Sequence, residues 1–275
     1  MESRSILITG SSTGIGYFCA KELQKMGYRV FATARKSEDV KRLQDEGLES
    51  LKLDLDDSKS IKDAVDEVLK RCDGKLYALF NNGAYGQPGA VEDLSRATLL
   101  AQFETNIFGT QELTNLLIPT FRACGEGRII QNSSVLGFVS MKHRGAYNAS
   151  KYALEGLSDT MRLELVDENI FVSLIEPGPI RSDFRKNALE KFLQNIDREN
   201  SPNKKEYEDK LESLKSEKDV PFTLGPEAVL KVLVHALEAK RPKARYRVTF
   251  PTKLFWFLKR VLSTRIIDFI ARKVS

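Results

Sequence analysis

Short apolar runs alternate with segments of helical spacing along most of the 275-residue chain. Six runs rich in Val, Ile, Leu and Phe have the length and composition of buried strands: residues 4–10, 28–35, 49–55, 75–82, 127–134 and 170–178. Between them, residues 15–27 and 57–74 have helical spacing, with Gly27 and Gly74 as terminators and Asp57 or Ser58 as the second helix's cap. Repeated β-α alternation predicts an α/β fold, a doubly wound parallel sheet of about seven strands with helices on both faces. Ligands of such sheets bind at the carboxyl ends of the strands.

No internal repeat or low-complexity linker divides the chain. We therefore expect one nucleotide-binding catalytic domain over residues 1–250 and a basic amphipathic extension over residues 251–275. Residues 183–221 break the β-α rhythm with a charged, amphipathic insertion after the sixth strand. Long excursions at strand ends are usually functional, so we expect this insertion to be a helical lid.

The composition argues against several classes of protein. Three widely spaced cysteines without a C-x-x-C pair indicate reduced thiols, and with only two histidines we expect no metal site. The N-terminus passes directly into an apolar run, so we expect no signal peptide. No stretch approaches the roughly 18 apolar residues of a membrane-spanning helix. We expect a cytoplasmic protein, peripheral at most at the inner face of a membrane.

Positive charge is concentrated near the C-terminus. The net charge is +5, but residues 240–275 contain eleven Lys or Arg and one acidic residue, Asp268, so this segment carries +10 and the rest of the chain −5. This favours a local anionic partner of the tail, and we expect no nucleic-acid binding. Large apolar residues, Trp256 among them, are interleaved with the basic ones. The tail can be a terminal helix packed on the body or on a second subunit. We favour an anionic membrane surface, because aromatic residues and positive charge coincide.

The stretch "TGSSTGIG", residues 9–16, stands where the first strand turns into the first helix. Glycines there let the backbone approach a pyrophosphate, whose charge the helix N-terminus attracts. The spacing of Gly10, Gly14 and Gly16 is neither G-x-G-x-x-G nor a P-loop. A tight strand-to-helix turn is the alternative, but the strand-turn-helix context favours a nucleotide.

The end of the second strand indicates which nucleotide binds. Ala34 stands where an acid would bind a ribose 2′-hydroxyl, and Arg35 follows it. A missing acid beside an arginine suits a 2′-phosphate, which favours NADP over NAD. A solvated arginine at a strand end is the alternative. Asp54, at the end of the third strand, can accept from the adenine amino group or can start a turn.

Tyr147 and Lys151 lie four residues apart in "GAYNASKYALEG", so on a helix they share one face. They can be a solvated surface pair, or a phenol whose proton is made labile by a neighbouring cation. Ser134, thirteen residues before Tyr147, ends the fifth strand. Together with the glycine loop, these residues favour the second interpretation.

These motifs, in this order, resemble the short-chain dehydrogenase/reductase family. The family's T-G-x-x-x-G-x-G loop, N-N-A-G strand end, serine and Y-x-x-x-K pair correspond to residues 9–16, "NNGA" at 81–84, Ser134, and Tyr147 with Lys151. Asn106 matches the family's helix asparagine, and "EPGPIRS" at 176–182 matches its P-G loop. The resemblance extends to about residue 178 and implies a Rossmann-like fold.

The resemblance also implies a role for each residue. Tyr147 would pass a proton to or from the substrate oxygen, with its pKa lowered by Lys151 and by the oxidised nicotinamide. Ser134 would hydrogen-bond that oxygen, with Ser133 as the alternative. Lys151 would hold the nicotinamide ribose and Asn106 would position a relay water. The residues expected to contact the cofactor are Gly10, Ser12, Thr13, Gly14, Ile15, Gly16, Arg35, Asp54, Leu55, Asn82, Tyr147, Lys151, Pro177, Gly178, Ile180 and Ser182.

The substrate is less sharply defined. Four apolar residues of the expected lid share helical spacing, and three more follow Ser134: Leu189, Phe192, Leu193, Ile196, Phe138, Val139 and Met141. Such a stripe can be core or pocket. As a pocket it indicates a lipophilic carbonyl or alcohol, as in the hydroxysteroid and retinol dehydrogenases and acyl-dihydroxyacetone-phosphate reductases that this subgroup resembles. We expect an NADP-dependent oxidoreductase and a homodimer or homotetramer. The alternative is a nucleotide-sensing protein without turnover.

Overall fold

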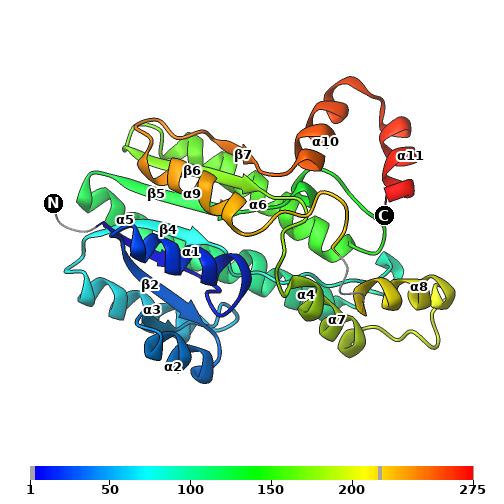
Figure 1. The fold of residues 1–275 in the computed structure, drawn as a ribbon, viewed down its shortest axis with the longest axis horizontal. Helices are drawn as coiled ribbons and strands as arrows, with labels where there is room; N and C mark the ends of the chain where they lie inside the picture. Colours follow the sequence, from blue (N-terminus) through cyan, green and yellow to red (C-terminus); the bar gives the residue numbers. More distant parts are fainter. Residues whose placement is uncertain (1–3, 216–218, 275) are drawn as a thin grey trace.

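Seven parallel strands form the centre of the molecule, in the order β3-β2-β1-β4-β5-β6-β7 (Figure 1). The computed structural model describes residues 4–215 and 219–274, so residues 216–218 of the expected lid lie outside the described part, as do both chain ends. The strands are β1 (Ser5–Ile8), β2 (Arg29–Ala34), β3 (Glu49–Lys52), β4 (Leu76–Asn81), β5 (Gly127–Asn132), β6 (Ile170–Glu176) and β7 (Arg245–Arg247). All six expected strands are present. The strand order reverses between β1 and β4, which is where sheets of this kind bind ligands.

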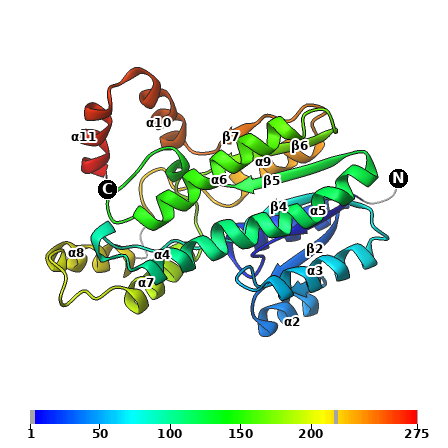
Figure 2. The ribbon, with the colours of Figure 1, turned by 180° about the vertical axis from the view of Figure 1, so that it is seen from behind.

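Helices cover both faces of the sheet, as Figures 1 and 2 show from opposite sides. They are α1 (Gly14–Lys25), α2 (Ser37–Asp45), α3 (Ser58–Arg71), α4 (Arg96–Phe103), α5 (Thr110–Cys124), α6 (Gly145–Glu164), α7 (Phe184–Asn195), α8 (Lys204–Lys215), α9 (Glu227–Glu238), α10 (Phe250–Val261) and α11 (Thr264–Val274). One apolar core joins α1 and α9 to the sheet, and a second joins α3, α5 and α6 to the opposite face. Strands covered on both faces are apolar throughout rather than alternating, which explains the continuous runs in the sequence.

The expected helix boundaries around α1 and α3 are confirmed. The Asp57 carboxylate accepts from the Lys59 amide at 2.9 Å, which caps α3. Gly27 and Gly74 follow α1 and α3 with φ of +91° and +69°. Only glycine adopts this conformation without strain, so both helices end there.

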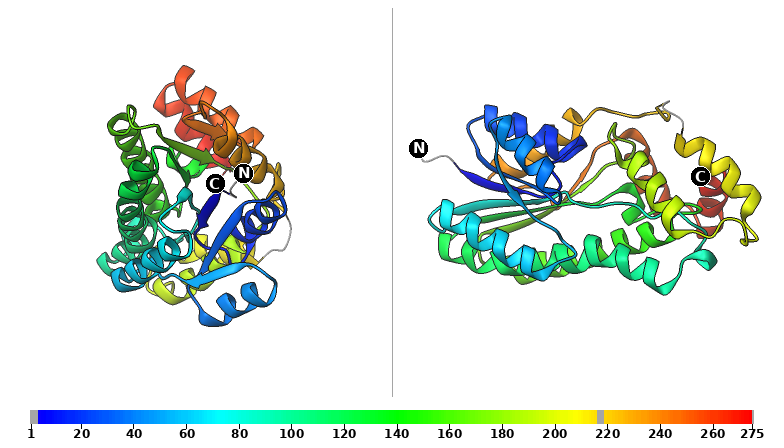
Figure 3. Two further views of the ribbon diagram at one scale, coloured as in Figure 1. Left: turned by 90° about the vertical axis from the view of Figure 1, so that its left-hand side faces the viewer. Right: turned by 90° about the horizontal axis from the view of Figure 1, so that it is seen from below.

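Four helices, α7, α8, α10 and α11, lie beyond the same end of the sheet (Figures 1 and 3). The expected lid contains two helices, α7 and α8, but the apolar residues of its stripe do not all face the same neighbour. Phe192 and Ile196 are buried against Leu94 and Ala146, whereas Leu193 is 46% exposed. The stripe therefore contributes mainly a small core that fixes α7 and α8 to the body.

The C-terminal tail forms two helices, α10 and α11, that are partly packed on the body. Phe255 of α10 is buried in an apolar cluster with Tyr147, and Ile270 of α11 packs against the same cluster. In the part of the chain that the structure describes, no helix is long and apolar enough to cross a membrane.

Candidate active site

The glycine loop between β1 and α1 can receive a diphosphate. Gly10 and Gly14 have φ of +65° and +59°, and a Cβ added there would lie 2.8 Å from Gly83 Cα and 2.9 Å from Ser182 Cβ. These positions therefore exclude any side chain. Thr13 precedes α1 without capping it through its side chain, and the first turn of α1 contains no acidic residue. The open N-terminal amides of α1 suit an anion.

Hydrogen bonds from β4 hold this loop in place. The Asn82 side chain donates to the carbonyls of Thr9 and Gly10 at 3.0 and 3.2 Å. The Thr9 hydroxyl accepts from the amides of Asn82 and Gly83 at 2.9 and 2.7 Å. Asn132 of β5 donates to the Asn82 side chain at 2.9 Å. Asn82 thus positions the loop, and the side chains at the ends of β4 and β5 are linked.

The other expected cofactor residues of this region lie in the loop, in α1 or just after β2 and β3: Ser12, Thr13, Ile15, Gly16, Arg35, Asp54 and Leu55. Arg35 is exposed and forms no ion pair with the described residues. Burial raises the pKa of Tyr85, and the positive charge of Arg35 opposes that rise, so the two side chains are near each other. The Asp54 carboxylate accepts from the Asp56 amide at 3.2 Å, which is the turn that we considered as its alternative role.

Sequence reasoning missed one basic residue near the loop. Arg42 of α2 donates to the Ser12 carbonyl at 2.6 Å while it pairs with Glu46. Within the sequence, Arg42 is one of several charges on an ordinary surface helix, so only the packing of α2 beside the loop reveals its contact.

Tyr147 and Lys151 lie on α6 and are both buried. The Lys151 ammonium is 5.6 Å from the centre of the Tyr147 ring and donates to the Asn132 carbonyl at 2.6 Å. Ser134, at the end of β5, hydrogen-bonds the Tyr147 phenol. The structure therefore brings together the serine, the phenol and the ammonium from two different elements.

Burial is the main influence on the protonation of Tyr147 and Lys151. Burial raises the pKa of Tyr147 to about 12, although the Ser134 hydrogen bond and the charge of Arg144 oppose that rise. Burial also lowers the pKa of Lys151 to about 8, against the opposing charge of Glu155. Burial is the largest influence on the phenol pKa in this arrangement, and the Lys151 ammonium donates to the Asn132 carbonyl. The expected lowering of the phenol pKa by Lys151 together with the oxidised nicotinamide stays a prediction.

The neighbouring serine faces elsewhere. The Ser133 hydroxyl donates to the Glu155 carboxylate at 2.5 Å, one helical turn beyond Lys151 on α6. Ser133 and Ser134 thus have different partners, and only Ser134 contacts Tyr147.

Asn106 lies in a π-helical turn, η2 (Glu104–Gly109), between α4 and α5. Its side-chain amide donates to the Tyr85 carbonyl and to the Ser150 hydroxyl, both at 3.0 Å, and its oxygen accepts from the Tyr85 amide at 3.2 Å. Ser150 belongs to the same turn of α6 as Tyr147 and Lys151. Asn106 therefore connects the loop after β4 to the helix of the candidate site, and π-helical turns are frequent at functional sites.

The loop after β6 folds back over the glycine loop. The Pro177 carbonyl accepts from the Val135 amide at 2.8 Å, and Gly178 lies so close to Thr249 that an added Cβ would approach its hydroxyl to 2.2 Å. Ile180 pairs with Leu224 in an isolated bridge. Ser182 lies over Gly14 as described above, so this loop and the glycine loop face one another.

Apolar side chains surround Tyr147. Val135, Leu136, Val139 and Phe255 are buried with it, and four others pack against this cluster: Phe138, Met141, Phe184 and Ile270. The Phe184 ring centre is 5.3 Å from that of Tyr147. Phe184 and Phe255 were not predicted here, because an apolar residue in an amphipathic helix does not reveal which surface its face contacts.

Known proteins share sequence with most of this chain. Residues 4–192 match the family model described as short chain dehydrogenase. The chain is 43% identical over 265 residues to the uncharacterized oxidoreductase YbbO of Escherichia coli K12, covering 96% of this chain and 93% of that protein. It is 31% identical to retinol dehydrogenase 8 of Bos taurus, covering 89% and 81%.

Solved structures show the same fold. A short-chain dehydrogenase from Streptomyces avermitilis superimposes with a TM-score of 0.76 at 25% identity, covering 94% of this chain and 93% of that one. Other structures with this fold were solved with NADPH, NADH or NAD.

Proposed function

The chain belongs to the short-chain dehydrogenases, oxidoreductases that act on CH–OH or C=O groups, and from this premise we propose that it is an NADP-dependent reductase of lipophilic aldehydes or ketones, or catalyses the reverse oxidation. The observation that carries the proposal is the buried phenol of Tyr147, which contacts Ser134 and lies within an apolar cluster. A proton donor with an apolar surround suits a carbonyl carried by a lipophilic molecule.

The residues present fit a nicotinamide dinucleotide. The glycine loop and the open N-terminus of α1 would hold the diphosphate, and Ser182 would bond the nicotinamide carboxamide. Arg35, exposed at the end of β2 beside buried Ala34, would hold the 2′-phosphate that distinguishes NADP from NAD. The exposed Arg35 side chain supports NADP as the cofactor. In cells that keep NADP mainly in its reduced form, this cofactor favours reduction of the substrate.

The bound cofactor supplies the hydride. In our proposal the chain's own residues handle the proton and the developing charge. Tyr147 gives its phenolic proton to the substrate oxygen in reduction, and the raised pKa keeps it protonated for this role. Ser134 donates to the same oxygen. Lys151, whose pKa near 8 leaves it charged at neutral pH, favours the phenolate that remains.

The test is a series of aldehydes and ketones of increasing apolar length, measured by NADPH absorbance. We expect KM to fall by about fourfold for each added methylene that the cluster buries. Equal KM values along the series would contradict a lipophilic substrate. NADPH binding without turnover of any carbonyl would instead support the nucleotide-sensing alternative, against which stands the presence of both Tyr147 and Lys151.

We also propose that the tail rests on an anionic membrane surface. Four large apolar residues of α10, at positions 250, 254, 257 and 261, are between 39% and 58% exposed and recur at helical spacing. Ile266 and Phe269 of α11 are likewise exposed, and Lys253, Arg265 and Arg272 accompany them. Such a surface suits acidic lipid, at about 1 kcal/mol for each basic residue near it. Because α10 also borders Tyr147 through Phe255, lipid-dissolved substrate would arrive next to the site.

A further inference from the structure

A cavity of about 590 Å³ lies between α6, the edge strand β7 and α10. Among the described residues that line it, Ser134, Tyr147 and Lys151 are absent: its wall includes Glu155 rather than Lys151, and Phe138, which also packs against the Tyr147 cluster, rather than Ser134. Four basic and two acidic side chains line it, the basic ones being Arg245, Arg247, Lys259 and Arg260. The volume is that of a small-molecule site.

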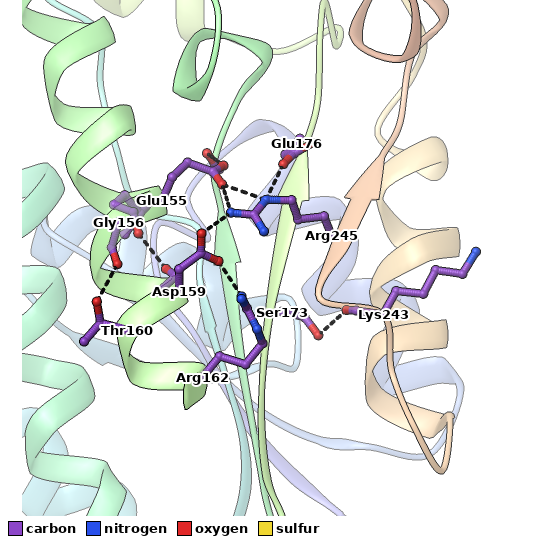
Figure 4. Close-up of polar contacts among 12 residues, drawn as sticks. Glu155, Gly156, Asp159, Thr160, Arg162, Ser173, Glu176, Lys243 and Arg245 are labelled. Atoms are coloured by element: carbon purple, nitrogen blue, oxygen red, sulfur yellow. Dashed lines mark hydrogen bonds and ion pairs between the residues drawn. The ribbon is translucent and has the colours of Figure 1, made fainter. Parts of the chain in front are cut away.

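Most contacts of the acidic side chains go to one of these four cations, Arg245. Arg245 pairs with Glu155 at 3.1 Å, with Asp159 at 2.6 Å and with Glu176 at 3.1 Å (Figure 4). Ser133 donates to Glu155 as well. Arg245 is thus a structural cation that ties β7 to α6 and β6, and little negative charge is left for the other three.

Those three cations are poorly neutralised. Arg247 Nε lies 3.1 Å from Glu176 Oε2, but neither atom has a hydrogen-bond partner among the described residues. Lys259 donates to the Phe138 carbonyl and to the Tyr152 hydroxyl, and Arg260 to the Trp256 carbonyl at 3.0 Å. In the described parts of the chain, neither Lys259 nor Arg260 forms an ion pair. Burial lowers the pKa of Arg247, and Arg260 lowers it further, as expected where like charges converge.

Trp256 holds two of the guanidinium groups beside a free donor. The guanidinium carbons of Arg247 and Arg260 lie 4.2 and 3.9 Å from the centre of its ring. Cation–π contacts of this kind fix long side chains that would otherwise move freely. The indole Nε1 is buried and has no partner among the described residues. Two guanidinium groups fixed on one ring and an indole N–H without an acceptor therefore border the same cavity.

We propose that this cavity is a second ligand site, separate from the candidate active site, which binds a phosphoryl group through Arg247, Lys259, Arg260 and the Trp256 indole. A guanidinium group can donate two parallel hydrogen bonds to two phosphate oxygens. A single carboxylate does not use all the donors that these side chains offer. The cavity is larger than phosphate alone, so the group is carried by a larger molecule. A soluble phosphate ester and the headgroup of an acidic phospholipid share this chemistry, and α10 with its exposed apolar stripe lies next to the cavity.

The chain contains a single tryptophan, so its indole signal reports on this cavity alone. The experiment titrates the full chain with potassium phosphate at constant ionic strength, maintained with potassium chloride, and follows the Trp256 indole N–H resonance. We expect a saturable shift, and an affinity about tenfold weaker in Arg260→Gln, which removes one charged donor. Arg265→Gln removes the same charge from α11 outside the cavity and should leave the midpoint unchanged.

The midpoint decides the result, because Arg260→Gln also alters the surroundings of the indole. Phosphate held only by the glycine loop would leave that midpoint unchanged in Arg260→Gln. A shift that chloride reproduces, or an equal midpoint in both variants, would overturn the proposal.

A second arm distinguishes the two sources. Phosphatidylcholine vesicles with and without phosphatidic acid are added, and Trp256 emission is recorded. A phosphatidic-acid-dependent change that Arg260→Gln weakens more than Arg265→Gln, and that free phosphate competes away, identifies a lipid headgroup. Phosphate binding without such a change identifies a soluble ester.

Discussion

Ser133 and Ser134 are adjacent, yet one bonds Glu155 and the other Tyr147. If Ser134 donates to the substrate oxygen, Ser134→Ala should lower kcat by about 100-fold or more, as for loss of an oxyanion-type donor. Ser133→Ala is the matched control: it removes a hydroxyl of the same size that contacts only Glu155, so kcat should stay within a few-fold while stability falls by about 1 kcal/mol. Steady-state kinetics and urea unfolding of both variants test this. Equal losses of kcat would refute the assignment of Ser134.

Arg35 is the residue on which the choice of cofactor rests. In Arg35→Asp a carboxylate would repel the 2′-phosphate and accept from a 2′-hydroxyl. We expect KM for NADPH to rise by about tenfold or more and that for NADH to fall. If NADPH keeps its advantage, another basic residue such as Lys36 reads the phosphate. Arg42→Gln serves as a comparison, because Arg42 touches the glycine loop only through the Ser12 carbonyl.

Lys151 predicts a pH dependence of stability. Its pKa in the folded chain is lowered by burial from 10.5 to about 8, so between about pH 8 and pH 10.5 the unfolded chain binds the extra proton. The buried charge destabilises the fold fully below pH 8, and this penalty is relieved as the pH rises. Lys151→Met removes it, so the free energy of unfolding of the variant relative to the wild type should decline from pH 8 to pH 10.5. A constant difference over this range would show that Lys151 is not desolvated.

The exposed apolar stripe of α10 should be needed for binding to anionic membranes. Replacing Leu254, Phe257 and Val261 of the exposed stripe with Ser should reduce co-sedimentation with anionic vesicles. High salt should weaken wild-type binding, because the attraction of the basic residues is screened. The control replaces Leu163 and Val166, which are more exposed than the stripe and lie at and just beyond the C-terminal end of α6. Equal, weak binding of wild type and both variants would mean that the tail is structural. Point changes are preferable to ending the chain at Phe250, which would also remove Phe255 from the Tyr147 cluster.

Elements with a strong local pattern could be predicted from the sequence. The six apolar strands, the Asp57 cap and the glycine terminators are set by local chemistry that needs no tertiary information. The strand β7 could not, because its three residues, of which only Tyr246 is buried, lack an apolar run and are held by pairing with β6. For a similar reason the sequence left the lid's apolar stripe open between core and pocket, because periodicity defines a face but not its partner.

At the scale of the whole molecule, the sequence predicts those residues of the candidate site that belong to a motif. The glycine loop, Ser134, Tyr147 and Lys151 carry recognisable spacings, and the structure places them after β1, after β5 and on α6, with Lys151 bonded to the Asn132 carbonyl at the end of β5. Phe184, Phe255 and Arg42 reach the site from helices that pack there, so no spacing indicates them. The charge balance around Tyr147 also depends on desolvation, which only the packed molecule defines.

The most direct measurement compares wild type and Tyr147→Phe by NADPH absorbance with the best carbonyl of the length series. The substitution keeps the ring and its packing against Phe184 and removes only the phenolic hydroxyl. We predict a fall in kcat of at least about 100-fold. NADPH affinity, measured by its fluorescence in the same preparations, should change by no more than about twofold. A Tyr147→Phe enzyme that retains more than about a tenth of the wild-type kcat would contradict the proposed role of the phenol.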